Sequence, residues 1–207
     1  MAIQTIVFDF GRVVGFFDHR LTWNRLAEHT DLAAAEMVAE LFGGTLEDDF
    51  ESGRISASEF LRKVRETCRL RCSEETIASA WADIFWPNEE VCALLPRLKP
   101  RYRLLLGSNT NELHARQFCG QFAAWLRHFD HLVLSHEIGV RKPKAGFFEH
   151  CSRLAGCAPS ECLFIDDLAA NVAGARACGW HGIVYTSYPD LCAQLTALGI
   201  ENLKMVG

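Results

Sequence analysis

The chain has 207 residues, of which 49% are hydrophobic and 23% are charged, and its formal net charge is -5. A chain of this length and composition can bury one compact core plus a modest insertion. No basic run is present, so nothing indicates a nucleic-acid partner or an anionic membrane surface. It begins without the charged and apolar regions of a leader and has no apolar run of about 18 residues, so a cytoplasmic location is expected.

Nine cysteines and eight histidines are scattered along the chain. The cysteines are odd in number, and several, such as Cys92 and Cys162, fall within predicted helices and strands, which is typical of reduced, buried thiols. Closely spaced cysteines such as Cys68 and Cys72 lack companion ligands at the spacing of a zinc site. The sequence therefore predicts neither disulfides nor a transition-metal site.

The first predicted strand ends in an acidic residue. β-Branched and aromatic side chains dominate residues 3–8, which predicts a strand buried on both faces, and Asp9 follows directly. Ligands of open α/β sheets bind at the carboxyl ends of the strands, so Asp9 is a candidate site residue. A solvated charge at the end of a strand is the alternative that this stretch alone leaves open.

The stretch from about residue 20 to residue 86 has a helical pattern throughout. Apolar residues recur every three or four positions, with a break at Gly43-Gly44, and Phe85 continues the last apolar stripe. Ser56 and Ser73 are expected to cap two of the helices. We predict a helical cap domain at 16–87, inserted into a core domain formed by 1–15 and 88–207.

From Asn88 onward, predicted strands and helices alternate, with Pro96 expected to kink or shorten the first of these helices. Helices are also expected at 112–127, 145–154 and 169–178, and strands at 102–106, 131–135, 162–165 and 183–186. This alternation predicts an α/β fold with a doubly wound parallel sheet that is covered on both faces.

Polar side chains lie at the ends of later strands or in the loops that follow. Ser108-Asn109 could cap a helix or form a turn, and Lys142, which precedes a proline, could be a surface charge. Asp166-Asp167 could cap the helix at 169–178. Adjacent carboxylates repel each other, however, so a cation or strong donors must compensate, and a hard divalent ion such as Mg²⁺ suits oxygen ligands.

Four stretches, taken together and in this order, resemble the four sequence motifs of the haloacid dehalogenase-like (HAD) hydrolases. The stretches are Phe8-Asp9, Leu104-Leu-Leu-Gly-Ser-Asn-Thr110, Gly139-Val-Arg-Lys-Pro143 and Leu163-Phe-Ile-Asp-Asp167. The resemblance implies Mg²⁺-dependent hydrolysis of a phosphate monoester, with a small, sugar phosphate-like metabolite as the substrate.

The resemblance also implies roles for individual residues. Asp9 would be the nucleophile that forms an aspartyl-phosphate, and Lys142 would neutralise both this carboxylate and the phosphate. The phosphate would be bound by Ser108, Asn109 and Lys142. The metal ligands would be Asp9, the backbone carbonyl of Gly11, Asp166 and Asp167.

The chain departs from most HAD phosphatases at Gly11, where they carry an aspartate that acts as general acid and base. A subfamily related to α-D-glucose-1-phosphate phosphatase also has glycine there, and this chain resembles it in the cap stretch Phe50-Glu-Ser-Gly-Arg-Ile-Ser-Ala-Ser-Glu-Phe60. Arg12 replaces the asparagine common in that subfamily. Two alternatives stay open: a phosphate-ligand or partner-binding protein without catalysis, and a 2-haloacid dehalogenase, against which Asp166-Asp167 argues.

The cap of such enzymes closes over the nucleophile and contacts the part of the substrate that does not react. Five residues near the start of the cap or its glycine break are expected to make these contacts: Phe16, Phe17, Asp18, His19 and Glu47. No oligomeric state is predicted.

Overall fold

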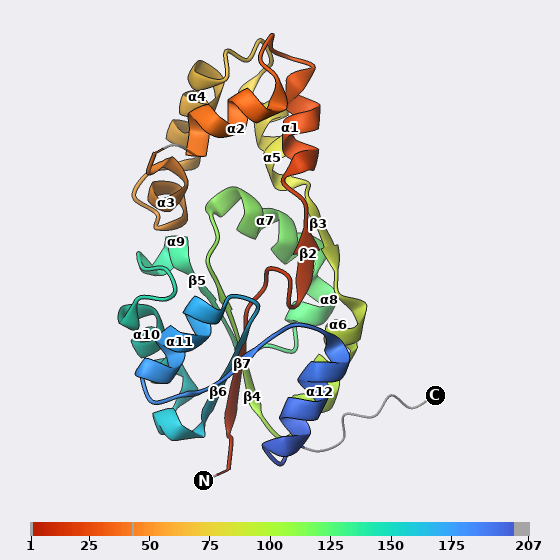
Figure 1. The fold of residues 1–207 in the computed structure, drawn as a ribbon, viewed down its shortest axis with the longest axis vertical. Coiled ribbons are helices and arrows are strands. Elements are labelled where there is room, and N and C mark those ends of the chain that lie inside the picture. The colour runs from red at the N-terminus through yellow and green to blue at the C-terminus, as the bar shows by residue number, and fades with distance from the viewer. Residues whose placement is uncertain (1, 43, 201–207) are drawn as a thin grey trace.

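The computed structural model describes residues 2–42 and 44–200, and its ribbon shows a sheet with flanking helices below a separate group of helices (Figure 1). The sheet has the strand order β5-β4-β1-β6-β7, and every pairing is parallel. Its strands are β1 (Thr5–Phe8), β4 (Arg103–Ser108), β5 (His131–Leu134), β6 (Cys162–Asp166) and β7 (His181–Val184). This confirms the predicted parallel α/β fold, with β1 at its centre.

Helices cover both faces of the sheet, because alternate side chains of the buried strands point to opposite faces. Ile6 and Phe8 of β1 pack in one apolar cluster with α6 (Glu89–Leu98), α7 (Glu112–Gln121), α8 (Ala123–Leu126) and α12 (Tyr188–Ala197). Val7 packs on the opposite side with α10 (Ala145–Ala155) and α11 (Ala169–Ala177). The short α9 (Ser135–Ile138) and the 3₁₀ turn Pro159–Glu161 complete this part.

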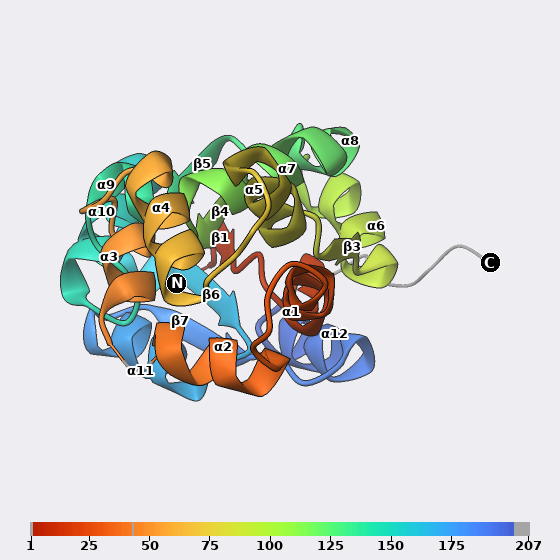
Figure 2. The same cartoon turned by 90° about the horizontal axis from the view of Figure 1, so that it is seen from above.

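The upper group of helices has its own apolar cluster, centred on Phe50, Phe60 and Trp81. It contains α1 (Arg20–Ala27), α2 (Ala34–Phe42), α3 (Leu46–Glu51), α4 (Ala57–Thr67) and α5 (Glu74–Ala82), which lie over the end of the sheet (Figure 2). The predicted caps are confirmed, since the hydroxyl oxygens of Ser56 and Ser73 each accept a backbone N–H three residues on. The predicted glycine break includes Gly43, which lies outside the described residues.

A short antiparallel ribbon joins the two parts, and it corrects the prediction that 20–86 is helical throughout. It consists of β2 (Gly15–Phe17) and β3 (Phe85–Pro87), so Phe85 lies in a strand and not on a helix. Three-residue strands carry too little alternation to be recognised from sequence. The predicted domain boundaries fall within this ribbon and remain a prediction.

Several predicted element ends also shift. The strand β4 extends to Ser108, so this residue is the last of the strand. The prediction that the strand ends at residue 106 and that Ser108 follows it is therefore wrong. The helix expected at 112–127 is divided at Phe122 into α7 and α8, and α6 continues through Pro96 to Leu98. The helix α12 was not predicted. Among the described residues, no helix has the length and hydropathy needed to cross a membrane.

Candidate active site

Asp9 follows β1 at the carboxyl end of the sheet, between β4 and β6. Its backbone N–H donates to the carbonyl of Ile165 (2.8 Å), which continues the register of the sheet, and its carboxylate accepts from the N–H of Phe10 (2.7 Å). The residue is only 7% exposed. The fold therefore holds a carboxylate in a fixed, largely dry position, as the sequence predicted for a site residue.

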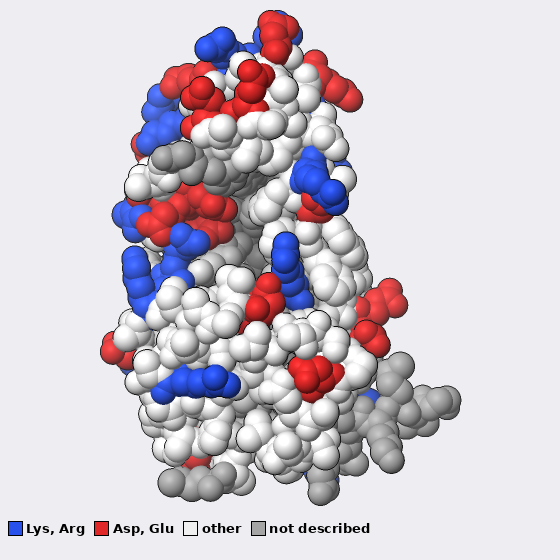
Figure 3. Space-filling model, viewed as in Figure 1, with Lys and Arg blue, Asp and Glu red and all other residues white. Residues whose placement is uncertain are grey.

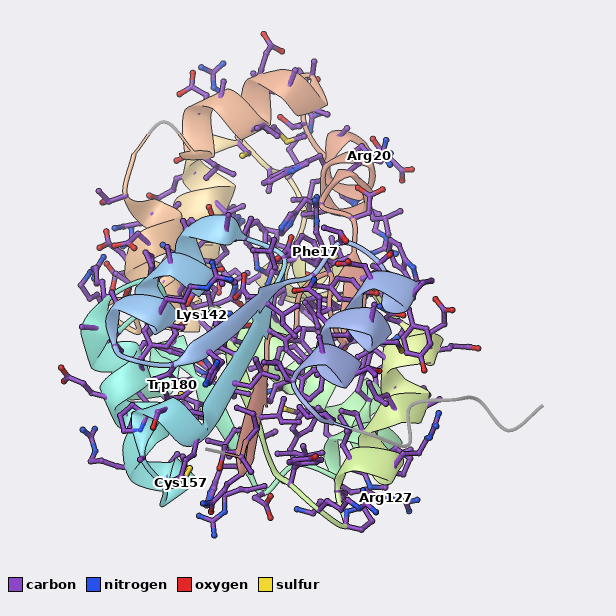
Figure 4. All side chains as sticks on the ribbon, turned by 60° about the horizontal axis from the view of Figure 1, so that its bottom comes forward. Phe17, Arg20, Arg127, Lys142, Cys157 and Trp180 are labelled. Carbon is purple, nitrogen blue, oxygen red and sulfur yellow. The ribbon has the colours of Figure 1, made fainter. Side chains whose placement is uncertain are left out.

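Lys142 comes from the loop before α10 and Phe17 from the ribbon (Figure 4), and both line the space over Asp9. The ammonium group donates to Oδ1 of Asp9 (2.6 Å), to Oδ2 of Asp166 (2.7 Å) and to the carbonyl of Gly107 (2.8 Å). These three acceptors match the three hydrogens of the ammonium group. Lys142 is thus a buried cation that joins the ends of β1, β4 and β6.

Burial and charge act against each other in this pair. Burial raises the pKa of Asp9 to about 7, although Lys142 opposes the rise; the nearby Asp166 carboxylate adds to it. Burial lowers the pKa of Lys142, but the charges of Asp9 and Asp166 outweigh it, so the pKa is raised and the amine stays protonated. The protein therefore keeps a fixed positive charge beside a carboxylate whose own charge is costly without compensation.

Asp166 is the last residue of β6 and Asp167 follows it, and both lie beside Asp9. Asp166 is fully buried, and its oxygens accept from the amide of Asn171 (3.0 and 3.1 Å) and the backbone N–H of Leu168 (2.8 Å). Asp167 is half-buried and forms no ion pair with a described residue, and burial raises its pKa. The carboxylates of Asp9, Asp166 and Asp167 each offer an oxygen within 4.8 Å of the others, a set of oxygen ligands that a divalent ion can bridge.

No other such cluster of acidic, histidine or cysteine side chains occurs in 2–42 and 44–200. All nine cysteines are free in the structure.

Asn109 positions the loop that carries Lys142. Its side-chain amide donates to the backbone carbonyl of Lys142 (3.0 Å) and accepts the backbone N–H of the same residue (2.8 Å). Ser108 is buried, and its hydroxyl donates to the carbonyl of Asn109 (3.3 Å). The structure thus brings both predicted phosphate-binding residues to the edge of the sheet where Asp9 lies, although the Asn109 amide is already engaged.

A cavity of about 400 Å³ opens over Asp9 and Lys142, and three of the predicted cap residues line it: Phe17, His19 and Glu47. The other two, Phe16 and Asp18, line a neighbouring hollow of about 700 Å³, which shares Arg12, Phe17 and Asp167 with the first. Asp18 is also bound to the guanidinium of Arg20 (2.8 Å). Of the five cap residues, His19 and Glu47 are therefore the polar ones that line the cavity over Asp9.

The space beside Gly11 is filled by an aromatic ring. A Cβ atom added at Gly11 would lie 2.9 Å from Cε1 of Phe17, closer than such atoms come in real proteins. His19 packs edge-on against Phe17 (ring centroids 5.0 Å), and its Nδ1 is buried without a hydrogen-bond partner. Burial lowers the pKa of His19, which favours the neutral imidazole. The Phe17 ring therefore occupies the space that an acidic side chain at position 11 would need.

Arg12 adopts a left-handed backbone conformation (φ 58°) in the turn after Gly11. Asparagine tolerates this conformation better than arginine does. The turn therefore explains why asparagine is common at this position in the subfamily that the sequence resembles. The turn forms nonetheless, because the N–H of Arg12 donates to the carbonyl of Gly15 (2.7 Å). The guanidinium then lies 5.7 Å from the centre of the Phe17 ring.

Three polar residues of the site were not predicted: Glu51, Arg141 and Asn171. Glu51 lines the cavity from α3, and its carboxylate pairs with the Arg141 guanidinium (2.8 Å), which also pairs with Asp48 (2.6 Å). Arg141 directly precedes Lys142 in the motif Gly139-Val-Arg-Lys-Pro143, and this adjacency is the feature of the sequence that could have indicated it. Its partners are some 90 residues away in the sequence, so only the folded chain reveals the contact.

Glu51 makes the stability of the protein depend on pH. Burial raises its pKa from 4.5 to about 7 although Arg141 is adjacent. The folded state then binds this proton more tightly than the unfolded chain, so the group contributes stability at low pH that is lost as pH rises through this interval. We expect the Tm of the wild type, relative to Glu51→Gln, to fall between about pH 4.5 and pH 7. Thermal unfolding across this range checks it, and a constant difference would contradict it.

Comparisons with known proteins agree with this geometry. Residues 3–179 match the model of the haloacid dehalogenase-like hydrolase family. The chain is 27% identical to a D-ribitol-5-phosphate phosphatase of Bacteroides thetaiotaomicron, covering 95% of this chain and 98% of the relative. It is 26% identical to a sesquiterpene phosphatase of Aspergillus oryzae, covering 94% of this chain and 96% of that relative.

The fold is also similar to that of solved HAD family structures. A HAD family enzyme of Bacteroides thetaiotaomicron, crystallised as its magnesium complex, superimposes with a TM-score of 0.79 at 25% identity, covering 90% of this chain and 94% of that chain. The match to the family model, residues 3–179, includes β1, β4, β5 and β6 together with Asp9, Lys142, Asp166 and Asp167. The chain therefore belongs to the haloacid dehalogenase-like hydrolase family.

Proposed function

We propose that the protein hydrolyses small-molecule phosphate monoesters, resembling sugar phosphates, through an aspartyl-phosphate on Asp9. The observation that carries the proposal is the ion pair between Asp9 and the buried Lys142, with two further carboxylates within ligand distance of Asp9. Support also comes from the relatives, which are named as phosphatases and one of which acts on a polyol phosphate.

In this proposal the residues of the chain have separate roles. Asp9 attacks the phosphorus, and the ester oxygen leaves as the P–O bond to the alcohol breaks; water then releases the phosphate and restores the carboxylate. Lys142 neutralises charge on both the nucleophile and the phosphate. Ser108 and Asn109 orient the phosphate oxygens at the end of β4.

The acidic cluster suits Mg²⁺, which prefers oxygen ligands and keeps some of its waters. Asp9, Asp166, Asp167 and the backbone carbonyl of Gly11 would hold the ion. When bound, it supplies charge neutralisation for the phosphate oxygens. Asp167 is the best candidate for direct ligation because, unlike the other two acids, it is not paired with Lys142.

Asp167→Asn should weaken Mg²⁺ binding and activity together, because it removes one charged ligand while keeping the shape. We expect the Mg²⁺ concentration for half-maximal activity to rise by at least ~10-fold, with rescue at high Mg²⁺. Titration of phosphate release with Mg²⁺ measures this. Asp31→Asn, which changes an exposed acid paired with Arg71, is the matched control. Full wild-type activity in the presence of a chelator would refute a metal role.

Gly11 should make the rate depend on the leaving group, because loss of a positioned acid and base typically costs ~10² to 10⁴-fold. Aryl, acyl and anomeric sugar phosphates should turn over faster than primary alkyl phosphates. Attack of water lacks its usual base as well, so stopped-flow with an aryl phosphate should show a product burst near one equivalent per site. If the enzyme shows neither a burst nor leaving-group dependence, another residue transfers these protons. His19, which lines the cavity, is then the candidate.

Restoring the acid tests the same point, but the Phe17 ring must make room for it. The double variant Gly11→Asp/Phe17→Ala should lose the burst and flatten the leaving-group dependence. Phe17→Ala alone is its control, since it opens the same space without an acid.

A panel of phosphate esters, with and without Mg²⁺, beside 2-haloacids tests the proposed function itself. Mg²⁺-dependent phosphate release with no halide release is expected. Halide release would favour a dehalogenase, and tight phosphate binding without turnover would favour a binding protein.

The proposal has three further parts, which rest on the sequence. They are membership of the subfamily related to α-D-glucose-1-phosphate phosphatase, the domain boundaries and a cytoplasmic location.

A further inference from the structure

The helix α3 presents a row of carboxylates to the cavity. It carries four acidic residues in six positions, and two of them, Glu47 and Glu51, lie one helical turn apart and line the cavity over Asp9. Figure 3 shows acidic side chains gathered over α3, beside the hollow between the helical group and the sheet. The cap therefore offers the leaving-group side of the cavity a surface that is rich in negative charge.

Three basic side chains line the cavity, those of Arg12, Arg141 and Lys142. Arg141 is shared between Glu51 and Asp48, and Lys142 is shared between Asp9 and Asp166. Glu47 is half-buried, and no described residue forms an ion pair or hydrogen bond with its carboxylate. Arg12 lies over the Phe17 ring and pairs with no described carboxylate, and Asp48 pairs with Arg54 as well. Of the two acids of α3 that line the cavity, Glu51 is therefore paired with Arg141, whereas Glu47 has no ion pair with a described residue.

The position of α3 is fixed against the core. The hydroxyl of Ser135 donates to the backbone carbonyl of Glu51 (2.6 Å), and the ion pairs of Arg141 join the same helix to the loop that carries Lys142. At Gly53, just after α3, the backbone approaches so closely that an added Cβ atom would collide with the carbonyl oxygen of His136. The two carboxylates are thus held at a set distance from the nucleophile and do not depend on a mobile loop.

We propose that Glu47 and Glu51 select phosphate monoesters whose leaving group is uncharged and rich in hydroxyls, and reject those whose leaving group carries a carboxylate or a second phosphate. This inference rests on the proposed function. Carboxylates accept hydrogen bonds from several hydroxyls, whereas a like charge in a partly desolvated site is strongly disfavoured. A protonated Glu51 would still bond hydroxyls but would no longer repel an anion, so the preference is measured above the pKa of about 7 to which burial raises this carboxyl.

Pairs of substrates that differ only in one group test this. Sorbitol 6-phosphate and 6-phosphogluconate, or glycerol 3-phosphate and 3-phosphoglycerate, exchange a hydroxymethyl for a carboxylate. All are alkyl phosphates, so the effect of Gly11 is the same within a pair. We expect the wild type to prefer the alcohol in kcat/KM by ~10 to 10²-fold. Equal values, or a preference for the carboxylate, would overturn the inference.

Substitutions test whether Glu47 and Glu51 cause the preference for the alcohol over the carboxylate. Glu47→Gln should reduce the ratio by ~10-fold, and Glu51→Gln should reduce it further because it also releases Arg141. Asp49→Asn makes the same charge change on α3 but lies outside the cavity, paired with Arg54, and should leave the ratio unchanged. Glu47 has no ion pair or hydrogen bond with a described residue to lose, so its variant remains informative if Glu51→Gln folds poorly. An unchanged ratio in Glu47→Gln would overturn the assignment.

Turnover of p-nitrophenyl phosphate distinguishes failure of this inference from failure of the proposed function. If this ester is hydrolysed with Mg²⁺ but neither substrate pair shows a preference, the inference fails and the proposed function stands. If no ester is hydrolysed, the proposed function itself fails.

Discussion

Asp9→Asn should abolish turnover, by on the order of 10⁴-fold or more, while leaving the fold intact. The amide keeps the size and shape of the side chain but cannot form the acyl-phosphate. The Tm should fall by no more than a few degrees, and at neutral pH it can rise, because burial already raises the pKa of this carboxyl to about 7. Steady-state kinetics and thermal unfolding measure the two effects. Turnover like that of the wild type would end the covalent hypothesis.

Lys142→Met should cost both activity and stability. The ammonium group is buried and pairs with Asp9 and Asp166, so its removal leaves two carboxylates close together without a cation. Breaking a buried ion pair in this way costs about 3–5 kcal/mol. Chemical denaturation in the absence of Mg²⁺ measures the loss.

Two further variants show whether the cost arises from the uncompensated charge. Lys99→Met removes a partly exposed ion pair with Asp130 and should cost at most ~1 kcal/mol. Lys142→Met/Asp9→Asn removes one of the stranded carboxylates and should recover part of the stability of Lys142→Met. If Lys142→Met is no less stable than Lys99→Met, the buried pair does not hold the strand ends together.

The sequence was sufficient to predict the sheet and the residues at its carboxyl edge, for a physical reason. Buried parallel strands are continuous apolar runs, and a charged residue that ends such a run stands out, as Asp9 and Asp166-Asp167 do. Since the ends of neighbouring parallel strands meet, their proximity follows from the fold.

The cap side of the cavity could not be predicted in the same way. The contact between Arg141 and α3 joins residues distant in the sequence, and an acidic helix such as α3 has the same pattern whether it faces solvent or a cavity. The ribbon of β2 and β3 was missed because each strand has three residues. Its consequence, the Phe17 ring against Gly11, is likewise visible only in the folded chain.

Detection of the covalent intermediate on Asp9 tests the proposed mechanism most directly. The enzyme is mixed with Mg²⁺ and an aryl phosphate, quenched in acid within the burst phase, and its intact mass is measured. We predict a mass increase of one phosphoryl group in the wild type, located at Asp9 by peptide mapping and absent from Asp9→Asn. Phosphate release that proceeds without any phosphorylated protein, or with the phosphoryl group on another residue, would contradict the account.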